Sequence, residues 1–249
     1  MTRKERERLD VLLFGRGLAA SRQDAQAMIM AAGVLVDGKK VDKPGSKVPI
    51  DAKLELLSVP RPFASRGGLK LDGALEAWRL DVAGKVCLDV GISTGGFTDC
   101  LLQRGAVRVY GIDVGYGQLD WRLRRDSRVI LFERENIRTF DPARIPVPVD
   151  LAVVDVSFIS LGMVIPCIVP MLKPGGEIIA LVKPQFEVGK GEVGKGGVVR
   201  DPAKQKETVE KVKGFMASSG FAFIAETESP VQGPKGNREF FLRAKKEGT

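Results

Sequence analysis

The sequence predicts an α/β fold, in which a mostly parallel sheet carries helices on both faces, together with a smaller N-terminal α+β unit. Short apolar runs alternate with helical patterns from residue 65 onward. A glycine-rich turn joins the first of these runs to a helix start. Pro60 and Pro62 form an extended connector before this region. We therefore expect an N-terminal unit at residues 1–59, a linker at 60–64 and a larger unit at 65–249.

Two short helices and a hairpin are expected in the N-terminal unit. Apolar residues at helical spacing indicate a helix within residues 8–18, and Ser21 is a candidate N-cap for a second helix over 22–32. The run Val34-Leu35-Val36 followed by Asp37-Gly38 is typical of a hairpin. Its return strand is expected at 39–41, and a further strand at 53–57.

The larger unit is expected to alternate strands with helices, so that most strands lie parallel. We expect helices at 67–78, 97–104, 118–124, 161–172 and 202–219, and strands at 86–90, 107–112, 129–132, 151–156, 177–182, 221–226 and 238–243. The glycine-rich segment 184–201 shows no apolar periodicity, which predicts a mobile functional loop.

The glycine turn after the strand at 86–90 narrows the class of ligand. A dinucleotide site needs a glycine where this chain has Ser93, because backbone must approach a pyrophosphate. S-adenosylmethionine carries no phosphate and suits Asp89, Gly91, Ser93 and Gly95 better. Asp113 ends the next strand, where a carboxylate can accept hydrogen bonds from ribose hydroxyls. The alternative is a glycine turn in another kind of α/β enzyme.

Composition restricts the partners and the compartment. The net charge of +8 favours a polyanionic partner, although a basic, well-solvated surface is the alternative. No apolar run reaches the roughly 20 residues of a membrane span, and the charged N-terminus does not resemble a secretory signal. The three cysteines fit no zinc spacing and indicate reduced thiols. We expect a cytoplasmic protein with no membrane contact and no metal; no pattern indicates its oligomeric state.

Four charged residues are placed to meet at one edge of the predicted sheet. Asp155 and Lys183 end apolar strands, Glu239 begins the last strand, and Lys70 lies in the leading helix. Ligands of open α/β sheets bind at the carboxyl ends of the strands, and buried charges are costly unless they are paired or used. The chain has no histidine, so proton transfer must use other groups such as lysine or a carboxylate. The alternative for each residue is a structural ion pair.

The N-terminal unit resembles the S4 RNA-binding module. The resemblance rests on Arg8-Leu9-Asp10, Ser21-Arg22, residues 29–33, the Val34–Gly38 turn and Lys43-Pro44. It implies RNA contact through Arg8, Arg16, Arg22, Lys39 and Lys40. Solvated surface charge is the alternative for each of these side chains.

The whole chain resembles the TlyA family, also called haemolysin A-like, in which an S4 module precedes an FtsJ-like domain. The matching segments are Ser65–Leu71, Asp89–Asp99, Asp113–Leu119, Asp155–Ser160, Lys183–Glu187 and Gly233–Glu239. The resemblance implies a class I, Rossmann-like methyltransferase fold of seven strands with an antiparallel closing strand. It also implies S-adenosylmethionine-dependent 2′-O-methylation of cytidine in ribosomal RNA.

The resemblance also assigns residues. It implies a catalytic tetrad of Lys70, Asp155, Lys183 and Glu239, and a cofactor site of Asp89, Gly91, Ser93, Thr94, Gly95, Gly96, Phe97, Asp113, Asn136 and Asp155. The chain departs from the family pattern in two places: Ile92 replaces a small residue, and Phe63-Ala64 replaces Tyr-Val.

Further basic residues of the larger unit are candidates for an RNA-facing surface: Arg66, Arg122, Arg124 and Arg125. Two other functions stay open. A base-modifying N-methyltransferase commonly carries an Asp/Asn-Pro-Pro-aromatic turn, where this chain has Asp155-Val156-Ser157-Phe158. A non-catalytic RNA-binding or haemolysin-like protein would need an exposed amphipathic or spanning segment to act on membranes.

Overall fold

The computed structural model describes residues 5–19, 22–30, 33–57, 62–189, 191–194 and 196–248. Contacts divide the chain into two units, Met1–Arg61 and Pro62–Thr249. Of the predicted linker 60–64, Pro60 and Arg61 lie outside the described residues. Phe63 and Ala64 contact the second unit: Phe63 is buried against Gly68, and the Ala64 amide donates to Asp99.

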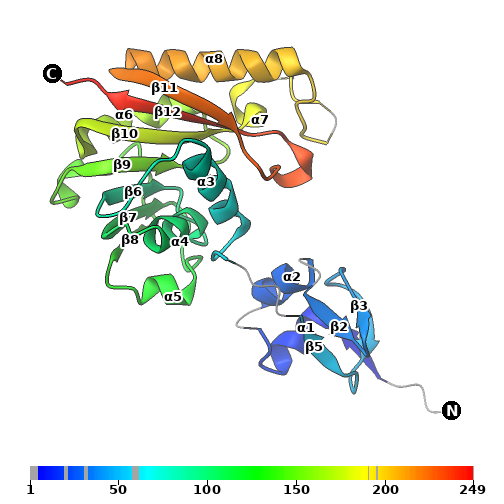
Figure 1. Ribbon diagram of the computed structural model, residues 1–249. Helices are drawn as coiled ribbons and strands as arrows, with labels where there is room; N and C mark the ends of the chain where they lie inside the picture. Colours follow the sequence, from blue (N-terminus) through cyan, green and yellow to red (C-terminus); the bar gives the residue numbers. More distant parts are fainter. Residues whose placement is uncertain are drawn as a thin grey trace. The chain divides into compact units, whose positions relative to one another are not determined.

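In its described residues, the smaller unit builds two small sheets and two helices around one core (Figure 1). Its elements are β1 (Arg6–Arg8), α1 (Leu9–Gly15), α2 (Arg22–Met30), β2 (Val34–Val36), β3 (Lys39–Lys40), β4 (Lys47–Pro49) and β5 (Leu54–Leu56). Leu9, Leu13, Ile29 and Val34 are fully buried in its core. The β1–β4 pair was not predicted, because each strand has three residues and β1 is Arg-Glu-Arg. The predicted cap Ser21 lies outside the described residues.

The larger unit alternates strands with helices, as predicted. Its strands are β6 (Val86–Val90), β7 (Arg108–Asp113), β8 (Val129–Glu133), β9 (Val149–Val154), β10 (Leu172–Val182), β11 (Phe221–Glu228) and β12 (Phe240–Lys246). Its α-helices are α3 (Arg66–Ala77), α4 (Gly96–Gln103), α5 (Trp121–Arg124), α6 (Ile165–Ile168), α7 (Pro184–Glu187) and α8 (Pro202–Ser218).

The strands form a seven-stranded sheet in the order β11-β12-β10-β9-β6-β7-β8. Strands β10, β9, β6, β7 and β8 are parallel, and β12 is antiparallel to both β10 and β11. This order confirms the seven-stranded, Rossmann-like arrangement with an antiparallel closing strand. It brings the ends of β6, β9 and β10 to one edge of the sheet.

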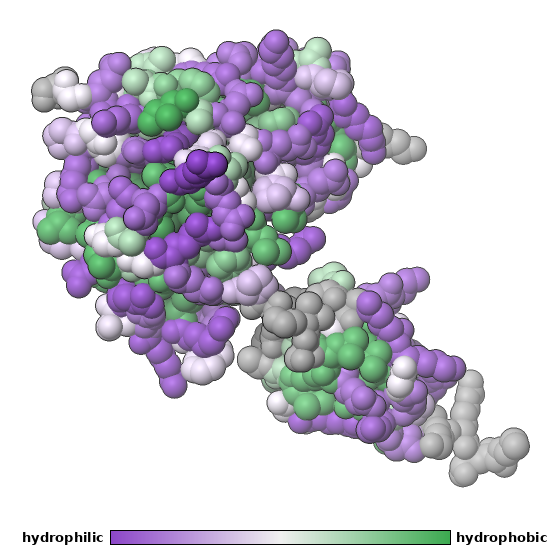
Figure 2. Space-filling model, viewed as in Figure 1, coloured by the Kyte–Doolittle hydropathy of each residue, from purple (hydrophilic) through white to green (hydrophobic). Residues whose placement is uncertain are grey.

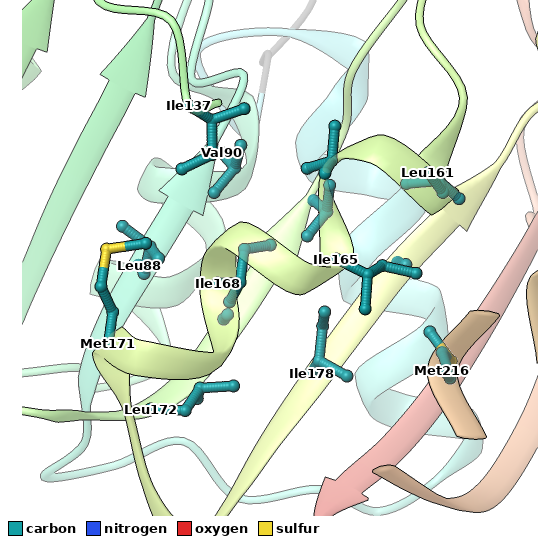
Figure 3. Close-up of a cluster of buried hydrophobic side chains, with 14 of the residues drawn as sticks. Leu88, Val90, Ile137, Leu161, Ile165, Ile168, Met171, Leu172, Ile178 and Met216 are labelled. Carbon is teal, nitrogen blue, oxygen red and sulfur yellow. The ribbon is translucent and has the colours of Figure 1, made fainter. Parts of the chain in front are cut away.

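Each face of the sheet has its own hydrophobic core. Figure 3 shows the core in which Leu88 and Val90 of β6 and Ile178 of β10 pack with Ile165 of α6 and Met216 of α8. Residues of α3, α4 and α5 pack on the other face, with Leu71, Leu75 and Leu101 fully buried. Together these cores fix the strand ends and the helices that carry the candidate site.

One predicted helix is wrong. The expected helix at 161–172 is divided into a 3₁₀ turn η2 (Leu161–Met163), α6, and a second 3₁₀ turn η3 (Val169–Met171). Pro166 and Pro170 explain the division, because proline lacks an amide donor and disfavours a continuing helix. The strand expected at 177–182 begins earlier, at Leu172, with a register shift between Leu172 and Glu177.

Hydrophilic residues cover most of the visible face of the larger unit (Figure 2). Within the described residues, no helix is long and apolar enough to cross a membrane. Cys87, Cys100 and Cys167 are all free.

Candidate active site

The glycine turn places backbone where side chains would not fit. Gly91 follows β6 with φ +87°, and a Cβ there would lie 2.5 Å from the Asp155 carbonyl oxygen. Gly96 begins α4 in contact with Ser65 at the start of α3, so a Cβ would overlap the Ser65 hydroxyl. The turn therefore brings β6, β9, α3 and α4 together at one point.

Ile92, the residue that departs from the family pattern, is accommodated by the neighbouring strand. It is buried, and its side chain occupies the space that a Cβ on Gly111 of β7 would need. The larger side chain therefore packs into the sheet, although its backbone borders the cavity.

A cavity of about 400 Å³ opens beside this turn. Its volume lies within the range of small-molecule sites. The residues that line it come from α3 and the segment before it, the glycine turn, the end of β9 and the loop before β12: Ser65, Arg66, Gly67, Lys70, Gly91, Ile92, Ser93, Thr94, Gly96, Phe97, Asp155 and Gln232.

Three carboxylates surround the glycine turn. Asp89 is fully buried and accepts a hydrogen bond of 2.7 Å from Thr98 of α4. Burial, together with the negative charges of Asp155 and Asp113, raises the pKa of Asp89 to about 7 against the effect of the Thr98 hydrogen bond. Carboxylates near this turn suit a ligand that carries positive charge, as the sulfonium and ammonium groups of S-adenosylmethionine do.

The carboxylate of Asp113 holds the turn from the end of β7. One oxygen accepts from the Ser93 amide at 2.7 Å and the other from the Gly115 amide at 2.7 Å. A carboxylate offers about four acceptor positions, so capacity remains for ribose hydroxyls. Ser93 itself adopts φ +48°, a conformation that Asp113 helps to hold.

Two lysine–carboxylate pairs lie at the cavity. Lys70 Nζ is 2.6 Å from Glu239 Oε2, and Lys183 Nζ is 2.5 Å from Asp155 Oδ1. The Glu239 side chain is fully buried, and both lysine side chains are about 10% exposed. Lys70 and Asp155 both line the cavity, so the two pairs border the same space. The four predicted residues are thus brought together as a buried ion pair, Lys70–Glu239, and a partly buried one, Lys183–Asp155.

Lys183 has a second partner that the sequence did not indicate. Its Nζ donates to the Ser157 hydroxyl at 3.0 Å. The Asp155–Lys183 contact is short but does not have hydrogen-bond geometry at Asp155 Oδ1. Ser157 therefore supplies a directed contact that helps to fix the amine.

Not every predicted cofactor residue reaches the cavity. Gly91, Ser93, Thr94, Gly96, Phe97 and Asp155 line it, whereas Asp89, Gly95, Asp113 and Asn136 do not. Gly95 faces Leu119 and Leu123, and Asn136 caps a turn by accepting from the Arg138 amide. Ser65, Gly67, Ile92 and Gln232 line the cavity but were not among the predicted site residues. Ser65 begins a motif that carries the family resemblance, whereas no local pattern marks Gln232.

Three predicted RNA contacts of the smaller unit take part in its internal structure. Arg8 and Arg22 both contact the buried carboxylate of Asp10, at 2.9 Å and 3.3 Å. Arg16 donates to the carbonyl oxygens of Ala52 and Ile50. The remaining two, Lys39 and Lys40, are exposed on β3.

The basic residues near α5 are exposed but engaged. Arg122 pairs with Asp120 and Arg124 with Glu133, while the Arg125 guanidinium lies 5.6 Å from the centre of the Trp121 ring. Arg66 differs from them because it borders the cavity directly.

An exposed aromatic side chain lies on the loop that follows β9. Phe158, three residues after Asp155, is 91% exposed and has φ +64°. Its ring centre lies 4.9 Å from that of Phe186 in α7. An exposed aromatic ring at the edge of a reaction site can stack on a base of an unpaired nucleotide.

The described residues of the glycine-rich segment after α7 are held by side-chain hydrogen bonds. The Asn237 side chain accepts from the Val199 amide at 3.1 Å and donates to the Gly197 carbonyl at 2.9 Å. Gln205 of α8 donates to the Val199 carbonyl at 2.7 Å. The predicted mobility of this loop is untested, and Lys190 and Lys195 lie outside the described residues.

Comparison with known sequence families gives two matches. The profile of the FtsJ-like methyltransferase family matches residues 63–246, and that of the S4 domain matches residues 7–53. The first match covers well over half of the chain and includes every residue that lines the cavity.

Individual proteins resemble the chain over nearly its whole length. A Mycobacterium tuberculosis protein named 16S/23S rRNA (cytidine-2'-O)-methyltransferase TlyA is 48% identical, over 95% of this chain and 89% of its own. Hemolysin A of Brachyspira hyodysenteriae is 38% identical, over 94% of this chain and 97% of its own. A solved structure from Streptococcus thermophilus, whose name carries the word hemolysin, matches with a TM-score of 0.77 and 40% identity, covering 98% of this chain and 90% of that one.

Proposed function

We propose that this chain, which belongs to the FtsJ-like methyltransferase family, methylates the ribose 2′-hydroxyl of cytidine in ribosomal RNA with S-adenosylmethionine. The observation that carries the proposal is the presence of two lysine–carboxylate contacts, one buried and one partly buried, on one cavity beside the glycine turn. The name of the Mycobacterium tuberculosis relative supports the substrate, and the S4 domain supports an RNA partner.

The residues around the glycine turn fit the cofactor. Gly91, Ser93, Thr94, Gly96 and Phe97 would surround it, and the negative charge of the nearby carboxylates matches its positive charge. Asp113 would accept hydrogen bonds from its ribose hydroxyls, and Asn136 would lie near its adenine, as the family resemblance implies. When bound, the cofactor supplies the methyl group from its sulfonium.

Lys183 is the residue proposed to act on the substrate hydroxyl. A ribose hydroxyl is a poor nucleophile until a base accepts its proton. Asp155 and Ser157 hold the Lys183 amine from two sides, which leaves one position of Nζ for the hydroxyl. In its neutral form the amine accepts the proton as the methyl group is transferred. Lys70, fixed by Glu239, would help to orient the substrate from the same cavity.

RNA would contact both units. In the smaller unit the exposed Lys39 and Lys40 are the remaining surface candidates, because Arg8, Arg16 and Arg22 stabilise the fold. In the larger unit Arg66, which lines the cavity, would bind phosphate, and the exposed ring of Phe158 would stack on a base. An enzyme with this substrate works in the cytoplasm, on ribosomal RNA or ribosomal subunits.

Mass-spectrometric mapping of 2′-O-methylcytidine tests the proposal. Ribosomal RNA from cells that lack the protein should miss a mark that the native chain restores and Lys183→Met does not. Lys173→Met is the matched control, because Lys173 pairs with Asp150 outside the residues that line the cavity. Methylation on a base nitrogen would instead favour the N-methyltransferase alternative. If the RNA carries the same modifications with and without the protein, the alternative of a non-catalytic RNA-binding protein would be favoured.

A further inference from the structure

Glu187 is a buried carboxylate with no role in the proposed transfer. Its side chain lies at the end of α7 and is 3% exposed. One oxygen accepts from the Leu161 amide at 2.7 Å, and the other accepts from the Ser160 hydroxyl at 2.7 Å. Burial raises the pKa of Glu187 against the effect of these two hydrogen bonds. Burying a charged carboxylate costs free energy, so the hydrogen bonds of Glu187 indicate which part of the fold it stabilises.

What it holds is the loop between β9 and η2. This loop, residues 155–160, carries Asp155, Ser157 and Phe158. Near its start Ser157 accepts from Lys183, and at its end Ser160 and Leu161 donate to Glu187. Both ties run to the segment that follows β10. The loop is therefore fastened on both sides of Phe158 to one neighbouring segment.

The backbone at Phe158 needs such fastening. A bulky residue with φ +64° is strained, and a ring that is 91% exposed has little more than its contact with Phe186 to offset the strain. If the far tie were lost, residue 158 could relax to a negative φ. That change would displace the Phe158 ring and the adjoining Ser157, which contacts Lys183.

We propose that Glu187 is a positioning residue for methyl transfer, which keeps Phe158 in its strained conformation and thereby places the 155–160 loop against Lys183. This rests on the proposed function of the same site. Glu187 acts through the loop and has no contact with the hydroxyl that reacts.

The test is steady-state methylation of ribosomal RNA by the full chain as native protein, Glu187→Ala and Glu187→Gln. Misplacement of reacting groups by about 1 Å costs roughly 100-fold, so Glu187→Ala should lower kcat about 10- to 100-fold and raise KM for RNA. The dissociation constant for S-adenosylmethionine should stay within about twofold, because the glycine turn is untouched. Glu187→Gln keeps an acceptor for Leu161 and should recover most of the rate.

A second background separates positioning from general stability. Glycine adopts a positive φ without steric cost, so Phe158→Gly needs no tie to hold residue 158. Adding Glu187→Ala to Phe158→Gly should then lower kcat less than about threefold. Equal losses in both backgrounds would show that Glu187 does not act through the strain at residue 158.

The remaining outcomes also decide. If Glu187→Ala does not fold, Ser160→Ala removes one of the two hydrogen bonds, and normal kinetics for that variant would overturn the proposal. Parallel loss of cofactor binding in Glu187→Ala would overturn it too.

Amide hydrogen exchange provides a readout without turnover. The Leu161 amide should exchange faster in Glu187→Ala, and unchanged protection would contradict the hydrogen bond from Leu161 to Glu187 as the contact that holds the loop. An inactive native chain would refute the proposed function, whereas an active native chain with equally active variants refutes only this inference.

Discussion

The buried pair of Lys70 and Glu239 allows a sharp test of how the site is stabilised. Glu239 is fully buried, and Gly233 packs so closely that a Cβ there would overlap the carboxylate. Within the described residues its Oε1 accepts no hydrogen bond, and its Oε2 accepts from Lys70 at 2.6 Å. Lys70→Met would leave the carboxylate without this contact.

Removing one partner of a buried ion pair typically destabilises a protein by about 3–5 kcal/mol. We expect a loss in this range for Lys70→Met, a large part of the 5–15 kcal/mol that typical proteins possess. Removing the remaining charge in Lys70→Met/Glu239→Gln should recover at least about 2 kcal/mol. Lys173→Met is the matched control, since its partly exposed pair with Asp150 should be worth about 1 kcal/mol or less.

Urea unfolding of the full chain, followed by tryptophan fluorescence, measures these changes in the larger unit alone. The chain has two tryptophans, Trp78 and Trp121, and both lie in that unit. A loss below about 1 kcal/mol for Lys70→Met, or strictly additive single and double variants, would refute the reasoning that the pair is desolvated and coupled.

Other outcomes follow from the same site. Asp113→Ala should weaken S-adenosylmethionine binding by about 1.5–3 kcal/mol in calorimetry, and binding of NAD instead would contradict the cofactor assignment. We expect Lys183→Ala to slow single-turnover methylation about 10²- to 10⁴-fold, and Lys183→Arg should be nearly as inactive. Near-normal turnover of the arginine variant would show that only a positive charge is needed. The pKa of Asp89 is raised to about 7 in the folded state, so the folded protein binds a proton at this carboxyl between pH 4 and 7 that the unfolded chain has lost. The free energy of unfolding should therefore fall as pH rises from 4 to 7, by up to about 4 kcal/mol. Asp89→Asn should flatten that slope in urea unfolding, and an unchanged slope would assign it to other groups. Removing residues 1–59 should preserve cofactor binding and abolish methylation of ribosomal subunits. The RNA affinity of the full chain should fall as the salt concentration rises. Full methylation activity without residues 1–59 would exclude a role of the smaller unit in docking to RNA.

The sequence alone determined the alternation of strands and helices and the position of the glycine turn. Both depend on local signals, namely short apolar runs, turn residues and helix starts, which can be recognised in the sequence without knowledge of tertiary contacts. The same local chemistry could have divided the helix expected at 161–172, because Pro166 and Pro170 stand inside it. The family resemblance, carried by motifs spread over the chain, added the four charged residues of the site.

Tertiary structure decided which of these residues meet. Lys70 and Glu239 are separated by 169 positions, and no local pattern indicates that they form one pair while Lys183 and Asp155 form the other. The contact of Ser157 with Lys183, the hydrogen bonds from the smaller unit's arginines to Asp10 and to backbone carbonyls, and the hold of Glu187 on the loop after β9 are of the same kind. Each depends on how strands β9 and β10, or helices far apart in sequence, are brought side by side by burial of their apolar faces. A side-chain contact across that distance leaves no periodic trace in the chain, so packing alone selects it.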